Sequence, residues 1–253
     1  MLRAQRAYGN QAVANVLARD AHAAPRKPPP PRPAKQPLRE GREIDAIFDA
    51  SPYFHELVGA KLKKTSVQKV MQIDDEATFE RAWLTYAARS YNPRTKQNWT
   101  EADAKDFLAK EGVRAFQDED RGEIHIRKER ADLGTQLHEA MHLFSSDKWK
   151  RKMEYNANEG VTEYFTRKLG PEVSVERDDG SFLKQYTSVT HLVDTAGEPA
   201  VKSAYFEGEI GGLQTAVDAK EKGTFRKWVD LLESNDFKGA NALMKGAAPP
   251  KPD

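Results

Sequence analysis

The segment His138-Glu139-Ala140-Met141-His142 places two imidazoles four residues apart, with a carboxylate directly after the first. On an α-helix, residues i and i+4 lie one turn apart on the same face, so both rings can reach one ion. A catalytic zinc ion takes three protein ligands and leaves a fourth position to water, whose pKa falls toward neutrality. Glu139 can accept a proton from this zinc-bound water during attack on a carbonyl and return it to a leaving amine. The pattern therefore indicates hydrolysis of an amide bond.

The helix that carries this segment is predicted to begin after Asp132, which can act as its N-cap. Apolar residues recur on one side of it at helical spacing, beside the two histidines. They are Leu133, Leu137, Ala140, Met141 and Phe144. Two ordinary surface histidines would give the same five-residue pattern by chance in roughly one protein in a hundred, so neighbouring elements must decide.

A second helix is predicted to be capped by Asn158 and to end at Gly170-Pro171. Its expected core stripe consists of Val161, Tyr164, Phe165 and Leu169. Polar residues occupy another face, which can point at the metal; they are Glu159, Thr162, Glu163 and Thr166.

This second helix resembles the ligand-bearing helix of the thermolysin-like zinc peptidases, the gluzincins, which reads Asn-Glu-x-x-Ser-Asp. Asn158 and Glu159 match the Asn-Glu pair, Thr162 matches the Ser, and Glu163 matches the Asp. The resemblance implies that Glu159 is the third zinc ligand and that Glu163 orients His138 by a hydrogen bond. The chain departs from the family in having a longer carboxylate at Glu163. The resemblance covers roughly residues 130 to 170.

The sequence also offers other ligand sets. Glu154 and Glu163 are alternative third ligands. Metzincins require a glycine three residues and a histidine six residues beyond the second ligand histidine. The chain has Ser145 and Lys148 at these positions, which excludes that class.

Peptidases that resemble this chain commonly supply a tyrosine or histidine, from a segment after the ligand helix, to stabilise the oxyanion of the tetrahedral intermediate. Tyr186 and His191 are the candidates, both in a predicted helix that follows the loop 177–180. Tyr186 is the favoured donor, with ordinary core packing as its alternative role. His191 is expected to be structural.

Composition limits the other function classes. The 40 basic and 39 acidic residues give a net charge of +1, so no global field draws the chain to nucleic acid. The chain has no cysteine, so any metal must be held by histidine and carboxylate side chains. No window approaches the roughly 18 apolar residues of a membrane span. The first residues lack the apolar stretch of a secretory signal, so we expect synthesis as a soluble protein in the bacterial cytoplasm.

The chain is expected to contain four parts: a leader at 1–23, a proline-rich linker at 24–39, one domain at 40–244, and a disordered tail at 245–253. The domain is expected to be α+β, with a mainly helical, zincin-like fold and a small antiparallel sheet. Strands at 113–116 and 123–127 should form a hairpin with one solvent-exposed face. The second strand is expected to bind extended peptide as an edge strand. The favoured role of four aromatic residues is packing in the hydrophobic core, with a substrate subsite as the alternative. They are Trp83, Tyr86, Tyr91 and Trp99.

The opening residues 2–13 resemble the Gln-Arg-x-x-Gly-Asn-x-Ala-Val segment that begins proteins linked to bacterial extracellular contractile injection systems. The resemblance implies a cargo or toxin that a particle exports, and hence a zinc endopeptidase that acts on a polypeptide in another cell. Two alternatives stay open. One is a catalytically inactive binding or structural component of the particle, and the other is a zinc amidase that acts on the cell wall.

Overall fold

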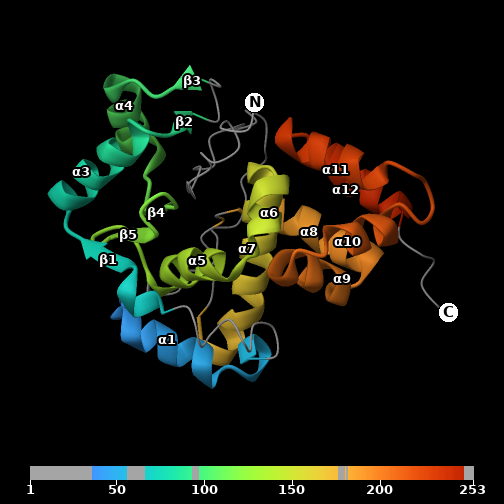
Figure 1. Cartoon of the computed structure of the whole chain (residues 1–253), viewed down its shortest axis with the longest axis horizontal. Coiled ribbons are helices and arrows are strands. Elements are labelled where there is room, and N and C mark those ends of the chain that lie inside the picture. The colour runs from blue at the N-terminus through green and yellow to red at the C-terminus, as the bar shows by residue number, and fades with distance from the viewer. Residues whose placement is uncertain (1–35, 56–65, 93–96, 176–179, 181, 248–253) are drawn as a thin grey trace, which may run out of the picture.

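The computed structural model describes residues 36–55, 66–92, 97–175, 180 and 182–247. The predicted leader, most of the proline-rich linker and the last six residues lie outside this part of the chain. The expected α+β, mainly helical class is confirmed. Figure 1 shows a sheet with its covering helices on one side and a larger helical region on the other, with α5 between them.

The sheet is mixed, with strand order β1-β5-β4, and not purely antiparallel as expected. Strands β4 (Ala115–Asp118) and β5 (Glu123–Arg127) form the predicted antiparallel hairpin, in which Ala115 pairs with Ile126. Strand β1 (Met71–Asp74) pairs with the other side of β5 in a parallel orientation. β5 is therefore the central strand, and the expectation that it binds peptide at a free edge is wrong. The prediction of a solvent-exposed face is also wrong, because all of β4 and nearly all of β5 are buried.

A small aromatic core lies between the sheet and two helices, α3 (Glu76–Ala87) and α4 (Glu101–Glu111). Its large members are Phe79, Trp83, Tyr86, Trp99, Phe107 and Phe116. The Trp83 indole donates a hydrogen bond to the carbonyl oxygen of Ala104 at 2.9 Å. The core role of Trp83, Tyr86 and Trp99 is confirmed, whereas the side chain of Tyr91, in the short β2–β3 pair (Tyr91–Asn92 and Gln97–Asn98), lies outside the described residues.

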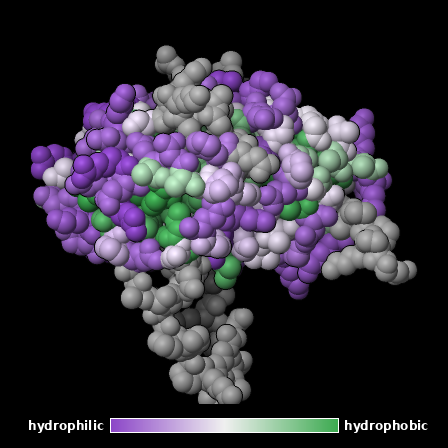
Figure 2. Space-filling model, turned by 90° about the horizontal axis from the view of Figure 1, so that it is seen from below, coloured by the Kyte–Doolittle hydropathy of each residue, from purple (hydrophilic) through white to green (hydrophobic). Residues whose placement is uncertain are grey.

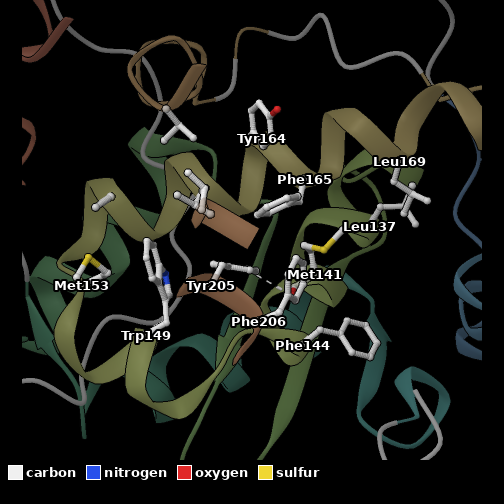
Figure 3. Packing of buried hydrophobic residues seen from close by; sticks show 14 of the residues in the cluster. Leu137, Met141, Phe144, Trp149, Met153, Tyr164, Phe165, Leu169, Tyr205 and Phe206 are labelled. Carbon is white, nitrogen blue, oxygen red and sulfur yellow. Dashed lines mark hydrogen bonds between the residues drawn. The ribbon is translucent and has the colours of Figure 1, made fainter. Parts of the chain in front are cut away.

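The larger core surrounds α5 (Leu133–Phe144) and α7 (Tyr155–Leu169). Figure 3 shows Phe165 and Leu169 of α7 facing Leu137 and Met141 of α5, with Tyr205 beside them. Both predicted apolar stripes are buried here. The remaining elements around this core are α1 (Gly41–Ala50), η1 (Val67–Lys69), α6 (Asp147–Lys152), η2 (Gly170–Val173), α8 (Leu183–Ala196), α9 (Glu198–Lys202), the π-helix η3 (Ser203–Glu207), α10 (Ile210–Val217), α11 (Thr224–Glu233) and α12 (Phe237–Ala247).

The region before α7 differs from the prediction that Asn158 caps this helix. Residues 147–152 form α6, whose Trp149 is fully buried. α7 begins one turn earlier than expected, after Glu154. Asn158 therefore lies inside α7, where its side-chain oxygen accepts a hydrogen bond from the Trp149 indole at 3.0 Å. The same contact fixes the short helix against the long one.

The carboxylate of Glu198 connects α9 to α7 and to the segment after α1. It accepts hydrogen bonds from the hydroxyls of Tyr53 at 2.9 Å and Tyr164 at 2.6 Å, and pairs with Lys168 at 3.0 Å. Burial alone would raise the pKa of Glu198, but these three partners together hold it below its usual range. The folded protein therefore favours the charged form of this carboxyl.

Described structure continues beyond both predicted boundaries of the domain, residues 40 and 244. The backbone of Arg39 donates to the side-chain oxygen of Gln136 at 2.9 Å and accepts from its nitrogen at 2.8 Å, so the end of the predicted linker is attached to α5. At the other end α12 continues to Ala247. Within the described residues no helix is long and apolar enough to span a membrane. The face in Figure 2 is mainly hydrophilic, with its most strongly apolar area on the left and a paler apolar area on the right.

Candidate metal centre

Helix α5 holds the predicted motif in the protein interior. Asp132 caps it as predicted, accepting a hydrogen bond from the backbone nitrogen of Thr135 at 2.8 Å. Eleven of the twelve residues of α5 are buried. His138, Glu139 and His142 are only 2%, 3% and 1% exposed, so their side chains cannot be the ordinary surface residues of a chance match.

The ligand atoms of His138, His142 and Glu159 converge at one point between α5 and α7. The two Nε2 atoms are 3.2 Å apart, and Glu159 Oε2 lies 3.0 Å from that of His138 and 3.6 Å from that of His142. Ligands bound tetrahedrally to zinc at about 2.0–2.1 Å are about 3.3 Å from one another. The three measured separations therefore match the spacing that one small divalent ion requires, and the group could bind a metal ion.

The electrostatics of this group also favour a cation. Glu159 is fully buried, and among the described residues its Oε1 atom has no hydrogen-bond partner, which leaves a strong acceptor unused. Burial disfavours charge on His138, but its hydrogen bonds to Glu159 and Glu163 outweigh burial and raise the pKa of the imidazole to about 9. Burial lowers the pKa of His142 to about 4. The carboxylates thus attract positive charge to the point where the ligand atoms meet.

His138 is oriented by the carboxylate that the gluzincin resemblance implied. Its Nδ1 atom lies 2.9 Å from Glu163 Oε2, so Nδ1–H donates to Glu163 and Nε2 faces the metal position. The other oxygen of Glu163 accepts a hydrogen bond from Arg167 Nε at 2.7 Å. Glu163 is therefore not part of the ligand group, and its longer side chain reaches the imidazole directly.

His142 is oriented by a hydroxyl. Its Nδ1 atom lies 3.1 Å from Thr162 Oγ1, while the Thr162 hydroxyl donates to the backbone oxygen of Asn158 at 2.9 Å. The Tyr205 hydroxyl, from the π-helix η3, is 2.7 Å from Thr162 Oγ1. Thr162 can accept from both neighbours, which places the single proton of the neutral His142 ring on Nδ1 and leaves Nε2 free to bind a metal.

Two contacts of the site were missed by sequence reasoning. Phe182, just before α8, stacks on the His138 ring with the centroids 4.9 Å apart and the planes 4° from parallel. Tyr205 is separated from Thr162 by 43 residues. Neither residue stands in a sequence pattern that marks it, since one precedes α8 and the other lies in a helix far along the chain.

The remaining candidates lie elsewhere. Tyr186, in α8, stacks on Tyr164 with centroids 6.2 Å apart and lies under the Arg167 guanidinium at 5.0 Å. Its role as oxyanion donor stays a prediction. His191 is partly buried, with Nδ1 3.7 Å from Asp194. Glu154 precedes α7 and pairs with Arg226 at 3.4 Å, so it is not in the ligand group.

Comparisons of the chain with protein-family models, with curated proteins and with solved structures gave no match. The chemistry of the site must therefore be inferred from its own geometry. Two imidazole nitrogens and one carboxylate oxygen form a donor set that zinc uses in catalytic sites, with one coordination position left open.

Proposed function

We propose that this chain is a zinc-dependent endopeptidase. The observation that supports it best is the convergence of His138 Nε2, His142 Nε2 and Glu159 Oε2 within 3.0–3.6 Å of one another in the interior. A divalent cation bound to this group would offset the charge of the buried carboxylate. The hydrogen bonds that the Nδ1–H groups of His138 and His142 donate to Glu163 and Thr162 support the same assignment, since metal-binding histidines are commonly held in this way.

The chain also supplies a group for proton transfer. Zinc at this position would polarise a water molecule and the carbonyl of a peptide bond. At about 100° per residue, Glu139 lies about 100° around α5 from His138 and about 60° from His142, on the side of the helix that bears the ligands. Its carboxylate can take a proton from the attacking water and transfer it to the leaving nitrogen.

The delivery of the enzyme rests on residues 2–13, which lie outside the described part of the chain. We propose that this leader sorts the protein into a contractile injection particle and that the substrate is a polypeptide of the target cell. The resemblance of residues 2–13 to the opening segment of such proteins supports this proposal.

The proposed activity is tested by pairing the wild-type protein with Glu139→Gln. We expect both to bind one zinc per chain, because the ligands are intact, and we expect cleavage to fall by about 10²–10⁴-fold in the variant, because the base is lost. Zinc content is measured by elemental analysis after gel filtration, and cleavage by a proteome-wide search for new peptide termini.

The same experiment separates the alternatives. The wild-type protein would be identified as a cell-wall amidase if it binds zinc and releases fragments from peptidoglycan but produces no new peptide termini. Absence of both activities would identify a binding or structural component. Cleavage retained in Glu139→Gln would contradict the assignment of the base.

A further inference from the structure

Phe182 is buried for a reason other than ordinary core packing. It is 6% exposed, yet among the described residues it belongs to neither of the two apolar clusters. Its ring stacks almost parallel on the ring of His138, with the two centroids 4.9 Å apart. Its buried face therefore covers the imidazole of a candidate metal ligand.

The backbone of Phe182 is in an unfavourable conformation. Its φ of 52° and ψ of 18° are in the left-handed region, which a bulky residue rarely adopts and which costs of order one to several kcal/mol at such residues. Such strain persists only where the surrounding contacts require it, and it concentrates at functional sites. The stacking on His138 is the contact that Phe182 makes from this position.

Tyr186 follows Phe182 by four residues, in the first turn of α8, and its backbone N–H donates to the carbonyl oxygen of Phe182 at 2.8 Å. The Tyr186 ring lies 5.0 Å from the Arg167 guanidinium, and Arg167 in turn donates to Glu163 at 2.7 Å. Glu163 is the carboxylate that accepts from His138 Nδ1. The two aromatic residues thus reach the same imidazole by two routes, one direct and one through an arginine and a carboxylate.

We propose that the first turn of α8, through Phe182 and Tyr186, is the positioning element of His138. Phe182 fixes the plane of the ring and excludes water from its face, while Tyr186 holds Arg167 against Glu163. This inference rests on the proposed metal site and gives Tyr186 a positioning role behind that site.

The close approach of α8 to α7 is built into the sequence. A Cβ atom at Gly160 would lie 2.9 Å from a methyl carbon of Val189 and 3.0 Å from the backbone oxygen of Gln185. Only glycine fits between the two helices at this distance. This packing brings the start of α8 within reach of the His138 imidazole.

The proposal is tested in the full-length protein by zinc affinity, measured by competition with a chromophoric chelator, and by the visible spectrum after substitution with Co²⁺. Phe182→Leu keeps apolar volume but cannot stack, so we expect affinity to fall on the order of two- to tenfold and the Co²⁺ bands to shift. Phe182→Tyr keeps the ring and should restore both. Phe79→Leu, in the separate aromatic core, should lower the midpoint of thermal unfolding while leaving affinity and spectrum unchanged.

Tyr186 provides an independent pair of variants should Phe182→Leu fail to fold. Tyr186→Leu should weaken zinc binding, whereas Tyr186→Phe retains the ring under Arg167 and should bind zinc like the wild-type protein. Unchanged affinity and spectrum in Phe182→Leu and Tyr186→Leu would overturn the proposal. A fall in kcat in Tyr186→Phe at unchanged zinc affinity would overturn it in favour of the oxyanion role. Failure of the wild-type protein to bind either metal would instead reject the metal site itself.

Discussion

Replacing Thr162 by valine removes one hydroxyl from the metal site without changing its shape. Thr162 is fully buried, and its Oγ1 atom is the acceptor for His142 Nδ1 at 3.1 Å and a partner of the Tyr205 hydroxyl at 2.7 Å. Because burial keeps His142 neutral, its ring carries a single N–H proton, which is on either Nδ1 or Nε2. Without Thr162 to accept at Nδ1, the proton can move to Nε2, where it blocks metal binding.

The size of the effect follows from these contacts. Loss of a side chain that orients a metal-binding histidine weakens metal affinity about 10–100-fold, and about tenfold corresponds to about 1.4 kcal/mol. At saturating zinc, a tenfold weaker site gives about 1.4 kcal/mol less stabilisation by zinc. The hydroxyl of Tyr205 and the Nδ1–H of His142 would also lose a buried partner, which costs roughly 1–3 kcal/mol for each group that stays unpaired.

Thr166→Val is the matched control for this experiment. Thr166 lies one turn further along α7, is 1% exposed, and donates its hydroxyl to the backbone oxygen of Thr162 at 2.8 Å, as Thr162 does to Asn158. Each variant loses a hydrogen bond from its hydroxyl to the backbone oxygen four residues earlier, but only Thr162→Val also loses a contact with His142. We expect at least tenfold weaker zinc binding in Thr162→Val than in Thr166→Val, measured by chelator competition. Affinities within twofold of each other would refute the orienting role of Thr162.

Three further predictions concern the surroundings of the site. Glu163→Gln should weaken zinc binding about tenfold, because a neutral amide is a weaker acceptor than a carboxylate for the Nδ1–H of His138; wild-type affinity by chelator competition would contradict this. Glu198 has a lowered pKa, so its contribution to stability is present above its ordinary pKa of 4.5 and is lost as the pH falls through the lower folded value. Glu198→Gln should therefore lose stability at about pH 7 and show a weaker acid dependence in urea unfolding, whereas an unchanged dependence would count against the network. Gly160→Ala should destabilise the folded protein by about 1–3 kcal/mol, since the added Cβ would lie 2.9 Å from Val189. Gly211→Ala is the control, because a Cβ there would meet nothing within 4 Å, and it should stabilise helix α10 by about 0.5–1 kcal/mol. Thermal melts in which both variants shift in the same direction would reject the close-packing argument.

The parts of the structure that local periodicity determines could be predicted from the sequence. The stripe from Leu133 to Phe144 and the stripe from Val161 to Leu169 are buried as expected, because residues at helical spacing must share a face. The pairing of the two hairpin strands also follows from sequence, since a short connection allows only an antiparallel partner.

The parts that depend on distant contacts could not be predicted. Strand β1 reaches β5 across about fifty residues, and no local pattern shows that it lies parallel and makes β5 central. His125 of β5 is buried with its ring stacked on Phe116, and the pairing of β5 with β1 brings its Nδ1 atom 2.7 Å from Asp74 Oδ2. Phe182 and Tyr205 approach the metal site through the packing of later helices, which sequence spacing alone cannot give.

Anomalous diffraction at the zinc edge, from crystals grown with one equivalent of zinc, tests the metal centre most directly. We expect one strong peak at about 2.0–2.2 Å from His138 Nε2, His142 Nε2 and a carboxylate oxygen of Glu159. No peak at that position, or a peak bound only by other residues, would contradict the proposed site and the peptidase function built on it.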